Sequence, residues 1–174
     1  MIEQMRSLAL KEIERIGTTG KVEPTFIDAA VEFFRTYADM FHHGKEEGIL
    51  FKELSSKGMS EADHSMMVEL ANEHALARRT VNGLESLKGK YVAGTVETKN
   101  DIFEVMNTLV ELYSKHIQKE ETQFFFPSMK YFSEKEQEEM LDAFFEFDKN
   151  FTDRRYRKAI ETLKETLNNS TAPR

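Results

Sequence analysis

The stretch "MFHHGKEEGILF", residues 40–51, sets two histidines and two glutamates into a segment that otherwise has the pattern of an apolar helix. The helical pattern extends on both sides of this stretch, from Pro24 to about Ser55. Proline is favoured in the first turn of a helix, which supports that starting point. Imidazoles and carboxylates are poor core residues unless they are paired or bind something. The polar residues of this stretch therefore need an explanation.

The helical spacing of this segment predicts which polar side chains turn inward. One row is apolar except for a single histidine and a single glutamate: Phe33, Tyr37, Met40, His43, Glu47, Leu50 and Leu54. The neighbouring row, which contains His42 and Glu46, is more polar. We therefore expect His43 and Glu47 to face the core, with His42 and Glu46 at its margin.

Two later segments repeat this arrangement. Between residues 60 and 89, the apolar row is interrupted only by His74. Between residues 96 and 130, the apolar row contains His116 and Glu120, while Glu121 lies on a neighbouring apolar row and remains the alternative to Glu120. A single inward histidine is most simply a core residue with a hydrogen-bond partner. Three helices that all direct such residues inward indicate a shared site.

The residue types of this shared site indicate metal binding. A histidine and a glutamate four residues apart lie on one side of a helix and can bind the same ion. Imidazoles and carboxylates without sulfur suit iron, manganese or zinc. Carboxylates can also bridge two metals, and the cores of helix bundles commonly hold such sites. The predicted metal ligands are His43, Glu47, His74, His116 and Glu120.

The organisation of the chain is predicted to be all-α. Five helical segments are separated by short polar or glycine-containing connections, and the alternation typical of strands is missing. We expect residues 1–130 to form an antiparallel four-helix bundle. Residues 131–168 should form an additional C-terminal helical segment that packs on the bundle or on a second copy of the chain, as in a homodimer. Residues 169–174 are expected to be a disordered tail.

Composition excludes several other classes of function. The 174 residues include no cysteine, so disulfides, thiolate metal sites and thiol nucleophiles are ruled out. The net charge of −7 argues against nucleic acid as a partner. No apolar run is long enough to span a membrane and no signal peptide opens the sequence, so we expect a cytoplasmic protein without a membrane partner.

The candidate ligands and their surroundings resemble the hemerythrin-like, HHE cation-binding family. "HHGKEEGILF" contains His43 and Glu47, "NEHALARR" contains His74, and "KHIQKEETQFFFP" contains His116 and Glu120. The stretches "FIDAAVEFFRTYADMFHHGKEE" and "PSMKYFSEKEQEEML" also look like family sequence. The resemblance implies a four-helix bundle with a non-haem di-iron site, in which the two glutamates bridge the metals. Its function would be to bind or sense dioxygen or a related small oxidant.

Two departures from the family pattern bear on the site. The family has a histidine in its first helix, whereas this sequence begins "MIEQM". Either that histidine precedes Met1 in a longer chain or the site has one ligand fewer, with Glu3 and Gln4 as substitutes. The stretch "EETQFFFP" is one residue longer than the usual path, and a helical bulge there would bring Glu121 inward in place of Glu120.

Three functions remain open from the sequence. The first is a metal-binding module with a di-iron site, one half of which is incomplete. The second is an enzyme that reduces peroxide or nitric oxide at the same site. The third is a structural bundle whose metal site is degraded. We favour the metal-binding module, with iron as the metal and zinc or manganese as alternatives.

Overall fold

The computed structural model describes residues 1–150 and 160–165, and within these ranges every regular element is a helix. Most of the chain is α-helical, with three π-helical segments and one 3₁₀ turn. In chain order the elements are α1 (Ile2–Thr19), α2 (Pro24–Phe33), η1 (π, Phe34–His43), η2 (π, Glu46–Phe51), α3 (Lys52–Ser55), α4 (Glu61–Val92), α5 (Thr98–Lys119), η3 (π, Glu120–Phe124), α6 (Phe125–Ser128), η4 (3₁₀, Met129–Tyr131) and α7 (Glu134–Asp148).

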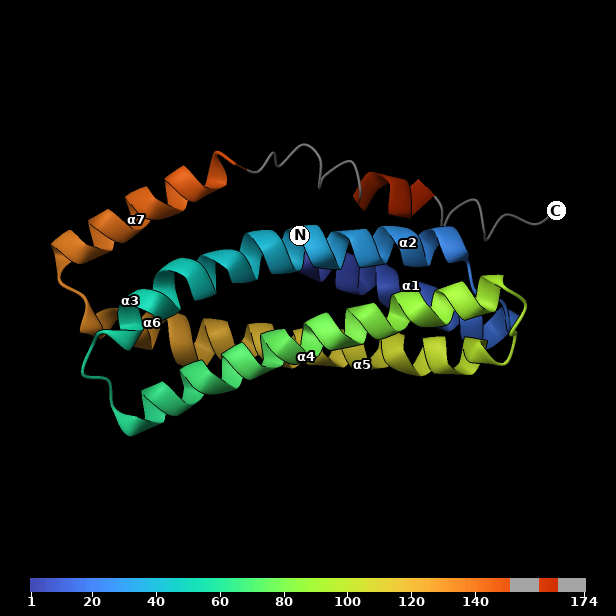
Figure 1. Cartoon of the computed structure of the whole chain (residues 1–174), viewed down its shortest axis with the longest axis horizontal. Helices are drawn as coiled ribbons and strands as arrows, with labels where there is room; N and C mark the ends of the chain where they lie inside the picture. The colour runs from blue at the N-terminus through green and yellow to red at the C-terminus, as the bar shows by residue number, and fades with distance from the viewer. Residues whose placement is uncertain (151–159, 166–174) are drawn as a thin grey trace.

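The elements form a bundle in which successive long helices run in opposite directions (Figure 1). The continuous rod from α2 to α3 lies beside α4, and α4 lies beside α5. Helix α1 is short, so the chain begins near the middle of the bundle and α1 covers only one half of it (Figure 1). The predicted fold class, an all-α four-helix bundle with an additional C-terminal helix, is confirmed.

Two apolar clusters fill the bundle, one toward each end. The larger cluster packs α1, α2 and η1 against α4 and α5, and Phe26, Phe33 and Ile102 are fully buried in it. The smaller cluster lies at the other end, where η2, α3 and the start of α4 pack against η3 and α7. The polar residues singled out from the sequence lie between the two clusters. The burial of apolar surface on both sides therefore holds them in place.

The segments η1 and η2 change which residues face the core. A turn of π-helix closes over one more residue than a turn of α-helix, so the inward row advances by more than 3.6 residues per turn. Ala38 is fully buried and Met40 is 58% exposed, the reverse of the predicted row. Glu46 is 5% exposed and lies in the core, whereas Glu47 is half-buried. The expectation that Glu47 faces the core while Glu46 lies at its margin was wrong, because it assumed an α-helical period.

The predicted bulge in "EETQFFFP" is confirmed as the π-helical segment η3. It does not bring Glu121 inward: Glu120 is 1% exposed and Glu121 is exposed. The extra residue is taken up beyond Glu120, so that Phe124 still reaches the smaller apolar cluster. Of the two glutamates that the sequence left open, Glu120 is therefore the one in the core.

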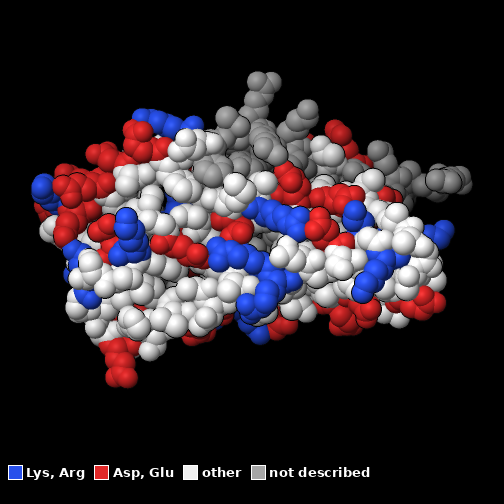
Figure 2. All heavy atoms as spheres, in the orientation of Figure 1, with Lys and Arg blue, Asp and Glu red and all other residues white. Residues whose placement is uncertain are grey.

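Helix α7 lies alongside the rod at one end of the bundle and packs against η2 (Figure 1). A capping box fixes its start, since the Ser133 hydroxyl accepts a hydrogen bond from the Glu136 amide and the Glu136 carboxylate accepts one from the Ser133 amide. Met140 is buried in the smaller apolar cluster. Acidic side chains gather on the outer surface at this end, at the left of Figure 2. The extension therefore rests on its own bundle, while the predicted domain boundaries and homodimer remain predictions.

The predicted disordered tail, residues 169–174, lies outside the described residues. Phe151, Tyr156 and Leu167, which belong to the predicted C-terminal helical segment, also lie outside them. Ile160 and Leu163 are described and are buried in the larger apolar cluster. Among the described helices, none combines the length and the apolar character that crossing a bilayer requires.

Candidate metal centre

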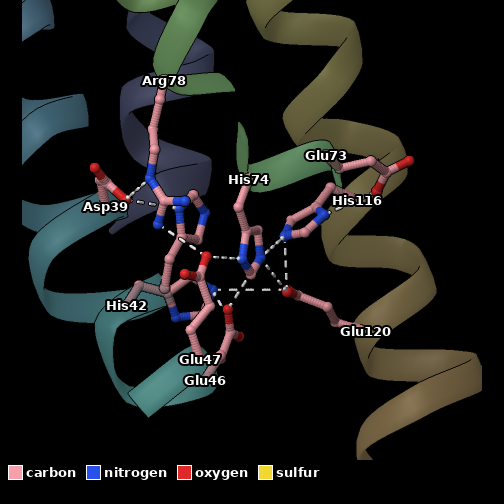
Figure 3. A network of polar contacts seen from close by, with 10 residues as sticks. Asp39, His42, Glu46, Glu47, Glu73, His74, Arg78, His116 and Glu120 are labelled. Carbon is pink, nitrogen blue, oxygen red and sulfur yellow. Dashed lines mark hydrogen bonds and ion pairs between the residues drawn. The ribbon is translucent and has the colours of Figure 1, made fainter. Parts of the chain in front are cut away.

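The histidines and glutamates that meet in the middle of the bundle come from three of its four helices (Figure 3). His42 and His43 end η1, and Glu46 begins η2 after Gly44 and Lys45. His74 lies in the middle of α4. His116 lies in the last turn of α5 and Glu120 begins η3, and these two also project into the core.

Four of these residues form a buried group. His43, Glu46, His74 and His116 each direct one nitrogen or oxygen to a common region in which these atoms lie within 4.8 Å of one another. His74 Nε2 is 3.1 Å from His116 Nε2 and 3.3 Å from Glu46 Oε2. Ligands held by metal bonds of about 2.0–2.2 Å lie roughly 3 Å apart, so these spacings are those of a coordination sphere.

A second group adjoins the first and shares Glu46 with it. It consists of His42, Glu46 and Glu120, which likewise have ligand atoms within 4.8 Å of one another. His42 Nε2 is 3.4 Å from Glu46 Oε1 and 3.6 Å from Glu120 Oε2. The other oxygens of the two carboxylates face the first group, with Glu46 Oε2 3.3 Å and Glu120 Oε1 3.8 Å from His74 Nε2. Each carboxylate thus lies between two sets of imidazoles, as a bridging ligand does.

The polar atoms of these groups are incompletely hydrogen-bonded among the residues that the structure describes. Six buried side-chain atoms there make no hydrogen bond: His42 Nε2, His43 Nδ1 and Nε2, both Glu46 oxygens and Glu120 Oε1. A buried polar atom without a partner costs about 1–3 kcal/mol. Such a concentration of imidazole nitrogens and carboxylate oxygens in one place fits a bound cation, and these ligand types suit iron, manganese or zinc.

A ring of carboxylates outside the two groups orients the imidazoles. His74 Nδ1 donates to Glu47 Oε1 at 2.7 Å, and His116 Nδ1 donates to Glu73 Oε2 at 2.9 Å. These bonds leave the Nε2 atom of each ring directed at the shared region. Asp39 Oδ1 lies 3.5 Å from His43 Nδ1. A carboxylate behind a ligating histidine fixes its ring orientation and raises its basicity.

Two cations hold this ring of carboxylates in turn. Arg78 donates from Nε to Asp39 Oδ1 at 2.7 Å and from Nη2 to Glu47 Oε1 at 2.8 Å, and Lys119 pairs with Glu73. Arg78 is one helical turn beyond His74 on α4. One guanidinium therefore supports the carboxylates behind two different imidazoles.

The pKa shifts within the groups reflect burial and the nearby carboxylates. Burial lowers the pKa of His43 to about 4, which keeps its imidazole neutral and able to bind a metal at neutral pH. Burial alone would also lower the pKa of His74, but the nearby carboxylates of Glu120 and Glu46 outweigh burial and raise it to about 9. The pKa of Glu120 is lowered because its interactions with His116, His42 and His74 outweigh burial. The carboxylates thus favour positive charge in this part of the core, which a divalent cation would also supply.

The structure brings together four of the five residues that the sequence predicted as ligands. His43, His74 and His116 share the first group with Glu46, and Glu120 belongs to the second. Glu47 lies outside both groups and contacts His74 from behind. The sequence missed His42 and Glu46 as members of the groups, although it placed both at the margin. His42 and Glu46 are four residues apart, the same spacing that identified His43 and Glu47, and this spacing could have indicated them. The ligand assignment itself stays a prediction.

Neither of the predicted substitutes for a first-helix histidine belongs to these groups. The Glu3 side chain is exposed and pairs with Arg6 at 2.8 Å, and Gln4 is exposed. The start of α1 nevertheless lies near the second group, because Met1 and Glu3 line a hollow of ≈ 220 Å³ together with His42 and Glu120.

Comparison with family models matches residues 2–125 to the hemerythrin HHE cation-binding domain. This match covers most of the chain, and the protein belongs to that family. The buried histidines and glutamates lie where a cation-binding domain needs its ligands, in the core of the bundle. Neither the curated proteins nor the solved structures give a match.

Proposed function

We propose that this protein holds a non-haem di-iron site in its bundle core, at which dioxygen or a related small oxidant binds or is sensed. The observation that carries the proposal is that Glu46 and Glu120 each face two sets of imidazoles with their two oxygens. Two bridging carboxylates with histidines on either side suit two metals better than one.

The protein holds the candidate ligands in fixed orientations in a buried part of the core. The Nδ1 hydrogen bonds of His74 and His116 fix both rings before any metal arrives, which lowers the cost of ordering them on binding. Glu46 and Glu120 would neutralise part of the charge of the ions. Iron bound there would supply a redox-active centre that coordinates a small oxidant at an open position.

A surface hollow of ≈ 340 Å³ lies against the first group and is lined by His43 and Tyr113 and also by Asp39 and Arg78. His43 is 1% exposed and Tyr113 is 2% exposed, so the hollow ends at buried side chains. A small oxidant that approaches from this hollow would suit the second candidate function, reduction of peroxide or nitric oxide, as well as the first. A purely structural bundle is disfavoured, because the burial of this cluster of imidazoles and carboxylates costs desolvation that a bound cation would offset.

The proposal is tested by metal content. Protein loaded with ferrous iron under anaerobic conditions should hold about two irons per chain by elemental analysis. Admission of air should then produce a near-ultraviolet absorption band from charge transfer between ligand and iron. Zinc or manganese retained in place of iron would change the metal assignment, and one iron or none would overturn the di-iron proposal.

A matched pair of histidine variants sharpens the test. His42→Leu removes the only imidazole of the second group and should lower the iron content from about two to about one per chain. His64→Leu alters an exposed histidine on α4, outside both groups, and should leave the iron content unchanged. Equal iron content in the two variants would contradict the assignment of a second metal to the His42 group. Peroxide consumption that depends on the loaded iron would favour the enzyme.

A further inference from the structure

A cavity of ≈ 630 Å³ lies between α7 and the bundle, and the candidate metal centre forms its inner end. His42 and Glu46 line that inner end. The cavity is far larger than a diatomic oxidant or peroxide requires, and it lies within the range of about 300–1,000 Å³ typical of sites for organic molecules. The function proposed above does not account for a space of this size.

The walls of the cavity are mostly apolar. They include Phe125, Phe126, Met129, Met140, Leu141 and Phe144. Phe126 is 85% exposed and Leu141 is 54% exposed, so apolar surface from α6 and α7 faces solvent at the cavity. Methionine side chains are flexible and adapt their shape to apolar ligands. An exposed apolar lining with a polar inner end is the usual character of a ligand site.

Helix α7 forms one wall of this cavity. Helix α7 is held near its start by the ion pair between Lys57 and Glu136, and at its end by the pair between Lys45 and Asp148 at 2.8 Å. Between these two ion pairs, Met140 and Leu141 line the cavity. The space is thus hollowed between elements of one chain, which suits a small molecule better than the face of another protein.

The charges around the cavity favour an uncharged occupant. Glu46 and Glu121 line it, and the outer surface at this end is acidic, so an anion is repelled (Figure 2). The cation in the lining, Lys45, already pairs with Asp148. A cationic ligand would lose its hydration against the apolar part of the lining. An apolar body with one hydrogen-bonding group avoids both penalties.

We propose that this cavity binds an uncharged organic molecule with a long apolar body and at most one hydroxyl or carbonyl group, of the kind represented by a medium-chain alcohol. Binding there needs no metal, so the proposal stands apart from the di-iron site. A bound molecule would lie against His42 and Glu46, and would therefore cover the second group from solvent on this side.

Methionine methyl resonances test the proposal, because the chain has nine methionines and two of them line the cavity. The full chain, labelled with carbon-13 at the methionine methyls, is titrated with decanol, decanoate and decylammonium. Decanol should give saturable shifts at Met129 and Met140, while Met5 and Met106, buried in the larger apolar cluster, stay unchanged. Its dissociation constant should be about tenfold lower than that of either charged probe.

Two charged variants and a control locate the site. Phe126→Asp and Leu141→Asp place a charge in the lining at side chains that are already exposed, and each should weaken decanol binding about tenfold. Val92→Asp introduces the same charge at a side chain that is 63% exposed, at the far end of α4, and should leave binding unchanged. Shifts spread over all methionines, or equal weakening in the three variants, would overturn the site. Tighter binding of decanoate or decylammonium would overturn the ligand class, and dimerisation that protects Met129 and Met140 from decanol would assign the cavity to a second copy of the chain.

Discussion

Arg78 donates a hydrogen bond to Glu47 Oε1 at 2.8 Å, and the same oxygen accepts a hydrogen bond from His74 Nδ1 in the first group. The same guanidinium holds Asp39, which lies behind His43. A surface ion pair contributes little to stability, so this arrangement is better explained by the site than by the fold. The outer carboxylates and their cations extend the metal centre well beyond its ligands.

Replacement of Arg78 by methionine should therefore weaken metal binding. Without the guanidinium, Glu47 and Asp39 are free to turn away, so His74 and His43 lose the partners that fix their rings. We expect the affinity for ferrous iron to fall by roughly tenfold, the usual effect of removing a partner behind a ligand. Competition with a coloured chelator measures this affinity.

Arg35→Met is the matched control for this variant. Arg35 forms a bidentate pair with Glu85 at 2.6–2.9 Å, and neither residue belongs to the two groups. Its replacement should leave the iron affinity unchanged. Equal loss in the two arginine variants would show that Arg78 acts on the fold in general and not on the imidazoles.

The register of η2 gives a second prediction, which concerns two adjacent glutamates. Glu46→Gln removes a carboxylate that faces both groups, so the iron content should fall from about two to one or fewer per chain. Glu47→Gln keeps a side-chain oxygen that accepts the hydrogen bond from His74 Nδ1, so iron content should be retained and only the affinity should fall. Elemental analysis of both variants after identical loading measures the difference. The opposite order of effects would restore Glu47 as the ligand.

The sequence was sufficient to predict those parts of the site that lie on regular α-helix. The apolar row of α4 with His74 is buried as predicted, because a continuous α-helix keeps its 3.6-residue period. The row through His43 failed between Met40 and Glu47, because no residue type marks a π-helical turn. Such turns depend on packing between helices, which the local sequence does not encode.

The outer carboxylates were predictable only in part. Asp39 lies four residues before His43, so helical spacing alone pairs these two side chains. Glu73 is next to His74 in sequence but hydrogen-bonds His116 on another helix. That contact depends on how α4 packs against α5 and could not be predicted from spacing.

Acid should release α7 from the bundle. Lys57 and the Ser133 amide and hydroxyl lower the pKa of Glu136 to about 2, from its usual value of 4.5. A lowered pKa means that the folded state favours the ionised carboxylate, so its stabilisation is present above pH 4.5 and is lost as the pH falls toward 2. The methyl resonance of Met140, a residue of α7 that is buried where this helix packs on the bundle, reports this change. Glu136→Gln should weaken the packing at neutral pH and remove the change with acid, whereas Glu139→Gln, at an exposed i,i+4 pair with Lys135, should behave as wild type. An unaltered acid transition in Glu136→Gln would assign the transition to other carboxylates.

The two glycines beside the candidate ligands should respond differently to alanine. A Cβ on Gly44 would lie 3.1 Å from Phe147 Cζ of α7, so this glycine permits the close approach of α7 to the end of η1. A Cβ on Gly48 would meet nothing within 4 Å among the described residues, and alanine there should stabilise the helix by about 1 kcal/mol. At Gly44 the same gain is offset because Phe147 must shift, so Gly44→Ala should be less stable than Gly48→Ala. Urea unfolding followed by circular dichroism measures both free energies. If Gly44→Ala is as stable as Gly48→Ala, the contact between Phe147 and Gly44 does not constrain α7, and the methyl resonance of Met140 should then be the same in the two variants.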